Sequence, residues 1–294
     1  MNGFLNLNKP QNFTSHDCVA KLRKILQTRK IGHGGTLDPS ATGVLPIAVG
    51  KATRLLQFLP TKKGYRGKIQ FGIVTNTDDL EGEIISEQSC PDLTLDEIKP
   101  HLSYFQGKIE QVPSAFSAIK KDGKKLYELA RAGKVVEVPS REVEIYQLEI
   151  IDWQAGEFPI LEIEVQCSAG TYIRSIARDL GAKVGTGATL AGLNRTLSCG
   201  LNLNDSLTFE QIINLKNDDR LSLIPLDQPL QNLSEIQLDE TTTQRWCYGQ
   251  KIIINDHQDD GFYRTYNHNR EFIGITEKYI QDVQNLIKAK VMLA

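Results

Sequence analysis

The sequence IGHGGTLDPSATGVLPIAVGKATR, residues 31–54, is the most informative stretch of this chain. Its glycines and its two prolines predict a shaped loop and not a regular element. Asp38 is the only acidic residue between Asp17 and Asp78, and Pro39 restricts the backbone directly behind it. Two roles are open for this carboxylate: a local Asx turn, or a charged group presented for chemistry.

Basic residues are concentrated around this loop. Residues 1–70 carry 12 Lys and Arg but only 2 acidic residues, although the whole chain has a net charge of −2. Such a distribution fits either a solvated basic face or a surface for nucleic acid. An aspartate in this setting stays ionised, which suits it to nucleophilic attack or to stabilising positive charge on a sugar.

Generic cofactor motifs fail at these glycines. The P-loop pattern would need a Gly where Leu45 stands, and the dinucleotide pattern would need one where Leu37 stands. A calcium-loop frame that begins at Thr77 ends on Gln88 in place of a bidentate Glu, and the 5 His residues lack metal-ligand spacing. A single carboxylate therefore favours glycosidic-bond chemistry in which no water is consumed, since hydrolysis uses two.

Hydrophobic periodicity predicts regular elements on both sides of the loop. We expect a basic helix at about residues 15–28 with Ser15 as its N-cap, and a strand at 65–71 with one buried and one basic face. Capping boxes at Thr94 and Thr208 predict two more helices. The remaining predictions are strands at 143–145 and 161–167, a helix that follows residues 168–170 and ends before Gly181, and a helix at 126–132.

The length of 294 residues corresponds to about two domains, and the texture changes to short polar strands near Leu226. No apolar run reaches the roughly 20 residues of a membrane span, and the N-terminus lacks the order of a signal peptide. The 5 cysteines are far apart, so no disulfide framework is indicated. We expect a cytoplasmic protein.

Residues 31–54 closely resemble the catalytic segment of the TruB-type pseudouridine synthases, which convert a uridine in the T loop of tRNA to pseudouridine. The similarity continues in order along the chain and is therefore highly specific. The further segments are GFLNLNKPQNFTSHD (3–17), GYRGKIQFGIVTNTDDLEGEI (64–84), QVPSAFSAIKKDGKKLYELARAG (111–133) and VQCSAGTYIRSIARDLG (165–181). Gly34 and Gly64 depart from the residues frequent in that family.

The resemblance implies roles for individual residues. Asp38 would be the catalytic aspartate that acts at the ribose, Tyr65 would stack on the target base, and Arg174 would pair with Asp38. His33 would help to hold the T loop open, and Leu193 would lie near the flipped base. We also expect RNA contacts from Lys9, Arg66, Lys120, Lys124 and Tyr172.

The resemblance further implies an α+β fold with a mixed, mainly antiparallel sheet flanked by helices. Residues 1–225 would form the catalytic domain, with a basic thumb-like insertion at about 111–139, and residues 226–294 a small PUA-like β domain. The implied reaction is isomerisation of uridine 55 of tRNA, which needs no cofactor and no metal. The expected partner is tRNA, with no membrane, no obligate protein partner and a monomeric state. A guide-RNA-dependent synthase and a non-catalytic tRNA-binding or tRNA-folding protein remain alternatives.

Overall fold

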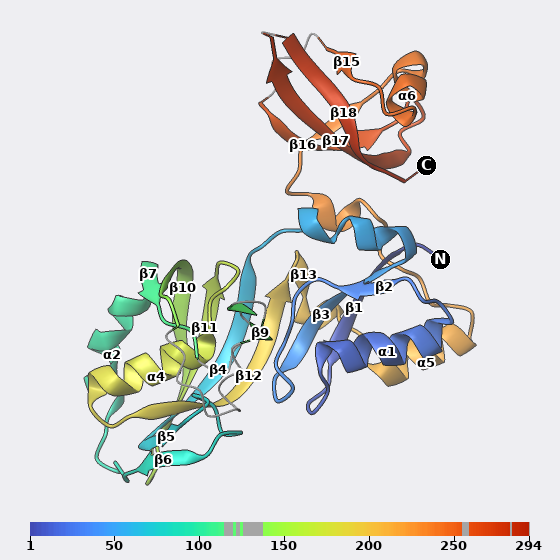
Figure 1. The fold of residues 1–294 in the computed structure, drawn as a ribbon. Coiled ribbons are helices and arrows are strands. Elements are labelled where there is room, and N and C mark those ends of the chain that lie inside the picture. The colour runs from blue at the N-terminus through green and yellow to red at the C-terminus, as the bar shows by residue number, and fades with distance from the viewer. Residues whose placement is uncertain (115–119, 122–123, 126–137, 255–258, 283, 294) are drawn as a thin grey trace.

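A mixed sheet of nine strands forms the body of the protein (Figure 1). This computed structural model describes residues 1–114, 120–121, 124–125, 138–254, 259–282 and 284–293. The strands follow the order β1 (Gly3–Lys9), β3 (Thr42–Val49), β12 (Ala188–Ser198), β4 (Lys63–Phe71), β11 (Ile160–Cys167), β10 (Arg141–Gln154) and β7 (Gly107–Gln111), with β2 (Ile31–His33) on β3 and β13 (Leu201–Asn202) on β12. Only β12 and β3 pair in parallel among these described strands. The predicted α+β class with a mainly antiparallel sheet is confirmed.

Strand β4 alternates as its sequence predicts. Gly67, Ile69 and Phe71 are buried, whereas Arg66 and Lys68 are exposed on the other face. An alternation of this kind fixes the register, because a shift by one residue would turn the basic side chains into the core. The strands β10 and β11 also lie at the predicted positions.

Two groups of helices cover the sheet, and each encloses its own hydrophobic cluster (Figure 1). The helices α1 (Ser15–Leu26) and α5 (Phe209–Asn217) pack on β1 and β3, and the helices α2 (Leu95–Leu102) and α4 (Ile173–Val184) pack on β4, β11 and β12. The capping boxes predicted at Thr94 and Thr208 are both formed. The two clusters adjoin in the middle of the sheet, where β3 pairs with β12 and β12 pairs with β4.

The prediction that residues 31–54 form a loop is wrong for most of the segment. It contains β2, β3 and a 3-10 helix (Gly50–Arg54), and only residues 34–41 connect β2 to β3 as a loop. Strand β3 is buried along nearly its whole length, so its sequence shows no alternation by which it could be recognised. Position 43 requires glycine for two reasons. Its φ is +103°, and a Cβ there would lie 2.4 Å from the carbonyl oxygen of Arg195.

Two predicted helix ends also differ. Helix α1 is capped by Thr14, whose side chain accepts from the backbone of Asp17, and Ser15 is its first residue. Helix α4 continues through Gly181 to Val184, and Gly185 at φ +88° is its C-cap. Gly181 is an internal packing position, since a Cβ there would lie 2.1 Å from the backbone nitrogen of Ala188.

A short hairpin of β5 (Ile73–Thr75) and β6 (Ile84–Glu87) frames the turn at residues 76–83. The strands β8 (Lys120–Lys121) and β9 (Lys124–Lys125) pair within the predicted insertion at 111–139. The helix predicted at 126–132 lies outside the described residues. The thumb-like insertion therefore stays a prediction for most of its length.

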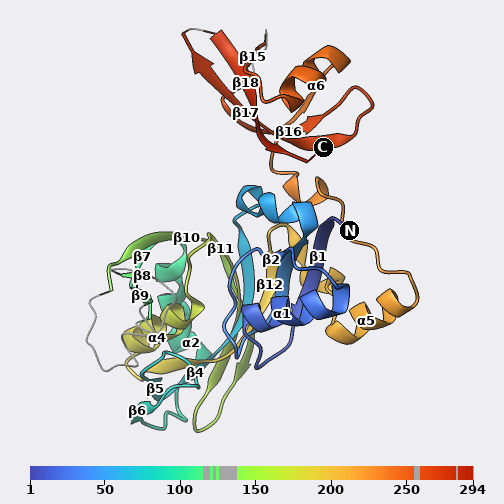
Figure 2. The same ribbon diagram turned by 45° about the vertical axis from the view of Figure 1, so that its right-hand side comes forward.

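The C-terminal part forms a second, five-stranded sheet that stands beyond the 3-10 segments at residues 50–58 (Figure 2). Its order is β14 (Glu235–Gln237), β16 (Gly261–Tyr266), β17 (Phe272–Gln281), β18 (Gln284–Met292) and β15 (Ile252–Ile253), with α6 (Glu240–Cys247) packed beside it. Ile275 and Val291 join Phe4, Leu55 and Phe58 in one hydrophobic cluster. The boundary near Leu226 stays a prediction, because the two parts share this cluster. No helix among the described residues is long and apolar enough to cross a bilayer.

Candidate active site

The loop that carries Asp38 is held by its backbone while its carboxylate stays accessible. Leu37 is buried, and its N–H and C=O both bond the Ser15 hydroxyl, at 2.9 and 3.2 Å. The backbone nitrogen of Ala41 donates to the carbonyl oxygen of Asp38 at 3.2 Å and closes a tight turn. The Asp38 side chain nevertheless keeps 39% of its surface exposed. The loop therefore presents one accessible carboxylate from a fixed backbone.

Lys9 supports this loop from inside the protein. Its side chain is fully buried, and its ammonium donates to the carbonyl oxygens of Pro10, Phe13 and Pro39 at 2.7–3.0 Å. Burial lowers the pKa of Lys9. Lys9 thus uses its three N–H groups to hold the backbone beside the Asp38 loop, and an RNA contact from Lys9 stays a prediction.

Arg174 lies in the first turn of α4 and reaches Asp38. One guanidinium nitrogen lies 3.0 Å from Asp38 Oδ2, and only 9% of the arginine side chain is exposed. The other terminal nitrogen contacts Asp79 Oδ2 and the carbonyl oxygen of Thr77, both at 3.3 Å. The pairing of Arg174 with Asp38 is present, and the guanidinium is divided between two carboxylates, Asp38 and Asp79.

Asp79 is a part of the site that the sequence reasoning missed. Its Oδ1 accepts hydrogen bonds from the Thr77 hydroxyl at 2.6 Å and the backbone nitrogen of Glu81 at 3.1 Å, which leaves Oδ2 for Arg174. The same stretch begins the calcium-loop frame that the sequence does not complete. Its Asp79 carboxylate binds Arg174. The signal that could have found it is the acidic turn in TNTDDLEG, directly after the predicted strand.

A cavity of about 400 Å³ opens beside Asp38 and Arg174. Tyr65 lines it from β4, and burial raises the pKa of the Tyr65 phenol, with Arg195 opposing in part. The phenol therefore stays protonated and uncharged at neutral pH. The other lining residues that we had singled out are Leu193 from β12 and Tyr172, which precedes α4. Five of the predicted site residues, Asp38, Tyr65, Tyr172, Arg174 and Leu193, thus line one cavity.

Two basic side chains, those of Arg195 and Lys63, also line this cavity. Arg195, 1% exposed and opposite Tyr65 in the β12–β4 register, donates to the carbonyl oxygens of Val44, Thr36 and Gly35 at 2.7, 3.0 and 3.2 Å. Lys63 bonds Ser198 Oγ at 2.8 Å, and burial lowers its pKa. We had not named either residue, although Arg195 follows Leu193 by two positions in the same motif. Both line the same cavity as Asp38.

The backbone at Tyr172 is fixed by one amide. Gln111, nearly fully buried at the end of β7, accepts from the Tyr172 N–H at 2.7 Å and donates to its C=O at 3.0 Å. The Arg141 guanidinium lies over the Tyr172 ring, 4.7 Å from its centroid. The ring therefore lies at the N-terminus of α4, the helix that carries Arg174.

Other predicted RNA contacts lie elsewhere. His33 packs edge-on against His16, with ring centroids 5.4 Å apart, and is not among the described residues that line the cavity. Arg66 points to the opposite face of β4, where it pairs with Glu164 at 3.3 Å and with Glu162 at 3.9 Å. Its charge is therefore neutralised within the sheet. The side chains of Lys120 and Lys124 lie outside the described residues.

The chemistry available in the cavity is that of one carboxylate, one phenol and several fixed cations. Within the described part of the chain, no group of three or more His, Cys, Asp or Glu residues could hold a metal ion. A carboxylate paired with Arg174 can carry or stabilise charge at a sugar carbon. A tyrosine ring can replace the stacking that a base loses when it leaves its helix.

Comparison with protein families places this chain among the pseudouridine synthases. The N-terminal domain of the TruB family pseudouridylate synthases matches residues 23–173, and the C-terminal domain of pseudouridine synthase II TruB matches residues 234–292. The chain belongs to the TruB family. The predicted resemblance, and with it the prediction of an enzyme of this class, is confirmed.

Close relatives carry one name. The chain is 54% identical over 255 residues to the tRNA pseudouridine synthase B of Trichormus variabilis, covering 87% of each protein. It is 48% identical to the protein of that name from Microcystis aeruginosa, covering 100% of this chain and 99% of that one. The protein of that name from Acaryochloris marina is 50% identical, again over 100% and 99%.

Solved structures share the fold at lower identity. A chain of a Cbf5-Nop10-Gar1 complex superimposes with a TM-score of 0.75 at 23% identity, covering 99% of this chain and 85% of that one. A chain of an H/ACA RNP bound to a substrate RNA containing 2′-deoxyuridine gives a TM-score of 0.74 at 21% identity, with the same coverage. At these identities the likeness extends to the fold alone.

Proposed function

We propose that this protein converts uridine 55 in the T loop of tRNA to pseudouridine, with Asp38, Tyr65 and Arg174 as its catalytic residues. The observation that supports it best is the Asp38–Arg174 pair, 3.0 Å apart, at the edge of the cavity that Tyr65 lines. Relatives about 50% identical over the whole chain are named tRNA pseudouridine synthase B. A tRNA substrate also implies action in the cytoplasm.

The reaction needs a uridine that has left its stack, and the cavity suits such a base. Extruding the base costs a few kcal/mol, which stacking on Tyr65 offsets by about 1–3 kcal/mol. Leu193 and Tyr172 offer further contact area around the ring. Arg195 and Lys63 add positive charge that suits the flanking phosphate groups.

Asp38 acts at the ribose in this proposal. The C1′–N1 bond breaks, the uracil turns within the cavity, and C5 forms the new bond to C1′ while the proton on C5 is lost and N1 takes up a proton. Direct attack at C1′ and an elimination route both use this carboxylate, and Arg174, 3.0 Å from it, orients it toward the ribose. Atoms balance without an oxidant or a second substrate.

We expect Asp38→Asn to bind tRNA with wild-type affinity and to form pseudouridine at least about 1,000-fold more slowly, because the amide carries no charge. Tritium release from tRNA labelled at C5 of uridine measures the rate, and filter binding measures the affinity. Asp92→Asn, which removes an exposed carboxylate outside the cavity, is the matched control. Release by Asp38→Asn at the wild-type rate would refute the assignment.

The two alternatives are separable by the same assay. A guide-RNA-dependent synthase would leave bare T-arm RNA unmodified, whereas we expect the pure protein to modify it alone, as a monomer without an obligate protein partner. A non-catalytic tRNA-folding protein would support the same phenotypes with Asp38→Asn as with the wild type. Mapping pseudouridine in tRNA from cells that lack the protein tests position 55 directly.

A further inference from the structure

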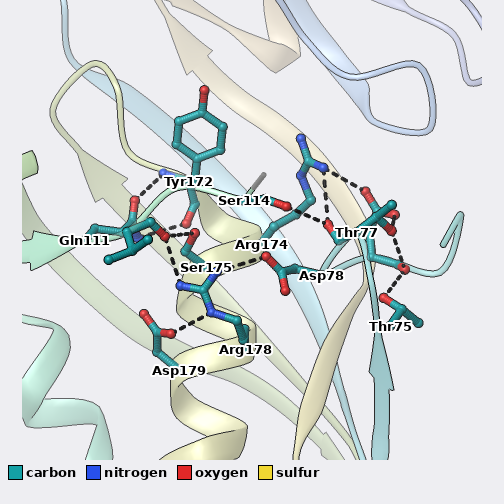
Figure 3. A network of polar contacts seen from close by, with 12 residues as sticks. Thr75, Thr77, Asp78, Gln111, Ser114, Tyr172, Arg174, Ser175, Arg178 and Asp179 are labelled. Atoms are coloured by element: carbon teal, nitrogen blue, oxygen red, sulfur yellow. Dashed lines mark hydrogen bonds and ion pairs between the residues drawn. The ribbon is translucent and has the colours of Figure 1, made fainter. Parts of the chain in front are cut away.

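Two arginines on one face of α4 meet two consecutive aspartates of a single turn (Figure 3). Arg174 pairs with Asp79 at 3.3 Å, and Arg178, one helical turn further, pairs with Asp78 at 3.0 Å. Residues four apart lie one above the other on a helix. The turn at 76–83 is thus attached to α4 by two parallel ion pairs, of which only the first touches the catalytic pair.

Arg178 is held from three sides. Its Nε lies 2.8 Å from Asp179 Oδ1, and its second terminal nitrogen donates to the carbonyl oxygen of Val112 at 2.9 Å. The Ser175 hydroxyl donates to that same carbonyl at 3.0 Å. The guanidinium therefore has a fixed position relative to α4 and the end of β7, and it does not reach the cavity that Tyr65 lines.

Asp78 adopts a conformation that its surroundings must impose. Its φ is +64°, in the left-handed region that non-glycine residues rarely adopt, and only 8% of the residue is exposed. Burial raises the pKa of Asp78, and the Arg178 charge opposes this. Its carbonyl oxygen accepts from the backbone nitrogen of Leu190 at 3.0 Å. The turn is thus determined by the ion pair together with the neighbouring strand β12.

We propose that the Asp78–Arg178 ion pair is a positioning device for the catalytic pair, a role that rests on the proposed function. It sets where the turn lies against α4, and hence where Asp79 meets Arg174. Asp79 holds Arg174 through a single oxygen, because its other oxygen is used by Thr77 and Glu81. A displacement of the turn by about 1 Å would break that contact and let Arg174 rotate toward Asp38, and displacements of this size cost up to about 100-fold in rate.

The decisive variant is Asp78→Asn, since asparagine tolerates a left-handed backbone and removes only the charge. We expect a single-turnover rate of pseudouridine formation about tenfold below the wild type, with tRNA affinity within about twofold. Arg178→Met should slow the reaction similarly, and Arg178→Lys should restore part of the rate by keeping the charge. Lys108→Met, which breaks the exposed Lys108–Glu142 pair on β7, is the matched control and should leave the rate unchanged.

A double variant separates positioning from general support of the fold. If Asp78 acts through Asp79, adding Asp78→Asn to Asp79→Asn slows the reaction little further. Independent, multiplying losses would overturn the proposal, as would a wild-type rate in Asp78→Asn. An inactive wild type would overturn the proposed function and this inference together, whereas an active wild type with an unaffected Asp78→Asn overturns the inference alone.

Discussion

Arg174 is the central residue of the site, because its guanidinium contacts two carboxylates at once. One nitrogen contacts Asp38, and the other contacts Asp79 and the backbone at Thr77. The planar fork of an arginine spans such a pair of partners, whereas a lysine ammonium is a single point of charge. The arrangement orients Asp38 from one side and leaves its carboxylate 39% exposed to the cavity.

We therefore expect Arg174→Lys to lower the single-turnover rate by about 100-fold while tRNA binding stays unchanged. The lysine can neutralise one carboxylate but cannot bridge both. Tritium release at saturating enzyme, with filter binding in parallel, checks this. A wild-type rate for the lysine variant would show that charge alone suffices.

His33 makes the stability of the folded protein depend on pH. Burial and the neighbouring His16 lower the pKa of His33 below its ordinary 6.5. The unfolded chain then binds a proton more tightly than the folded one, so this contribution to stability is full above about pH 6.5 and is lost as the pH falls below it. We expect the thermal midpoint of His33→Gln to fall less between about pH 7.5 and 5 than that of the wild type. The exposed His268→Gln is the control, and equal slopes for all three proteins would contradict the effect.

At the scale of elements, helix α4 decides how the two halves of the site approach each other. Its first turn carries Arg174, and its C-terminal half lies against the start of β12, where Gly181 permits backbone contact with Ala188. The sequence presents Gly181 as a helix stop, but the helix stops at Gly185. Close approach and termination both require glycine, and a single sequence does not distinguish them.

We expect Gly181→Ala to destabilise the protein by about 1–3 kcal/mol, although alanine is the better helix former. The new methyl would overlap backbone atoms of β12, which cannot move aside as a flexible side chain can. Gly156→Ala, at an exposed position with no atom within 4 Å of the added Cβ, should change the free energy of unfolding little. Urea titration of both variants checks the contrast.

At the scale of the whole molecule, the C-terminal sheet is joined to the main sheet by its core. Leu55 and Phe58 from the 3-10 segments pack with Ile275 and Val291. Lys51 and Arg54 add hydrogen bonds to the backbone of the last residues. Removal of the small sheet would expose apolar surface beside β1, the strand that leads directly to Lys9 under the catalytic loop.

We therefore expect a chain that ends at residue 225 to unfold at a lower temperature than the full chain and to aggregate sooner, because this cluster loses its cover. Calorimetry and light scattering measure the two effects. Leu55→Ser and Phe58→Ser in the truncated chain should restore solubility without restoring the midpoint. A truncated chain that is as stable as the full one would show that the parts are independent.

The sequence by itself determined the family, the strands whose side chains alternate between the two faces, and the position of the central carboxylate. Alternation along β4, the capping boxes and the segment around Asp38 are local signals, readable because each depends on neighbours along the chain. The family motifs in the sequence identify Asp38, Tyr65, Arg174 and Leu193, and all four line one cavity.

Only the tertiary structure decided which charges serve the site. Lys9 and Arg66 look alike in a basic segment, yet one is buried under the loop and the other is paired on the opposite face of the sheet. Asp79 and Arg195 join the site through partners that lie more than ninety residues away along the chain, Arg174 for the one and Val44 for the other. The function of a charged side chain depends on burial and on distant partners, and these exist only once the sheet and α4 have brought remote segments together.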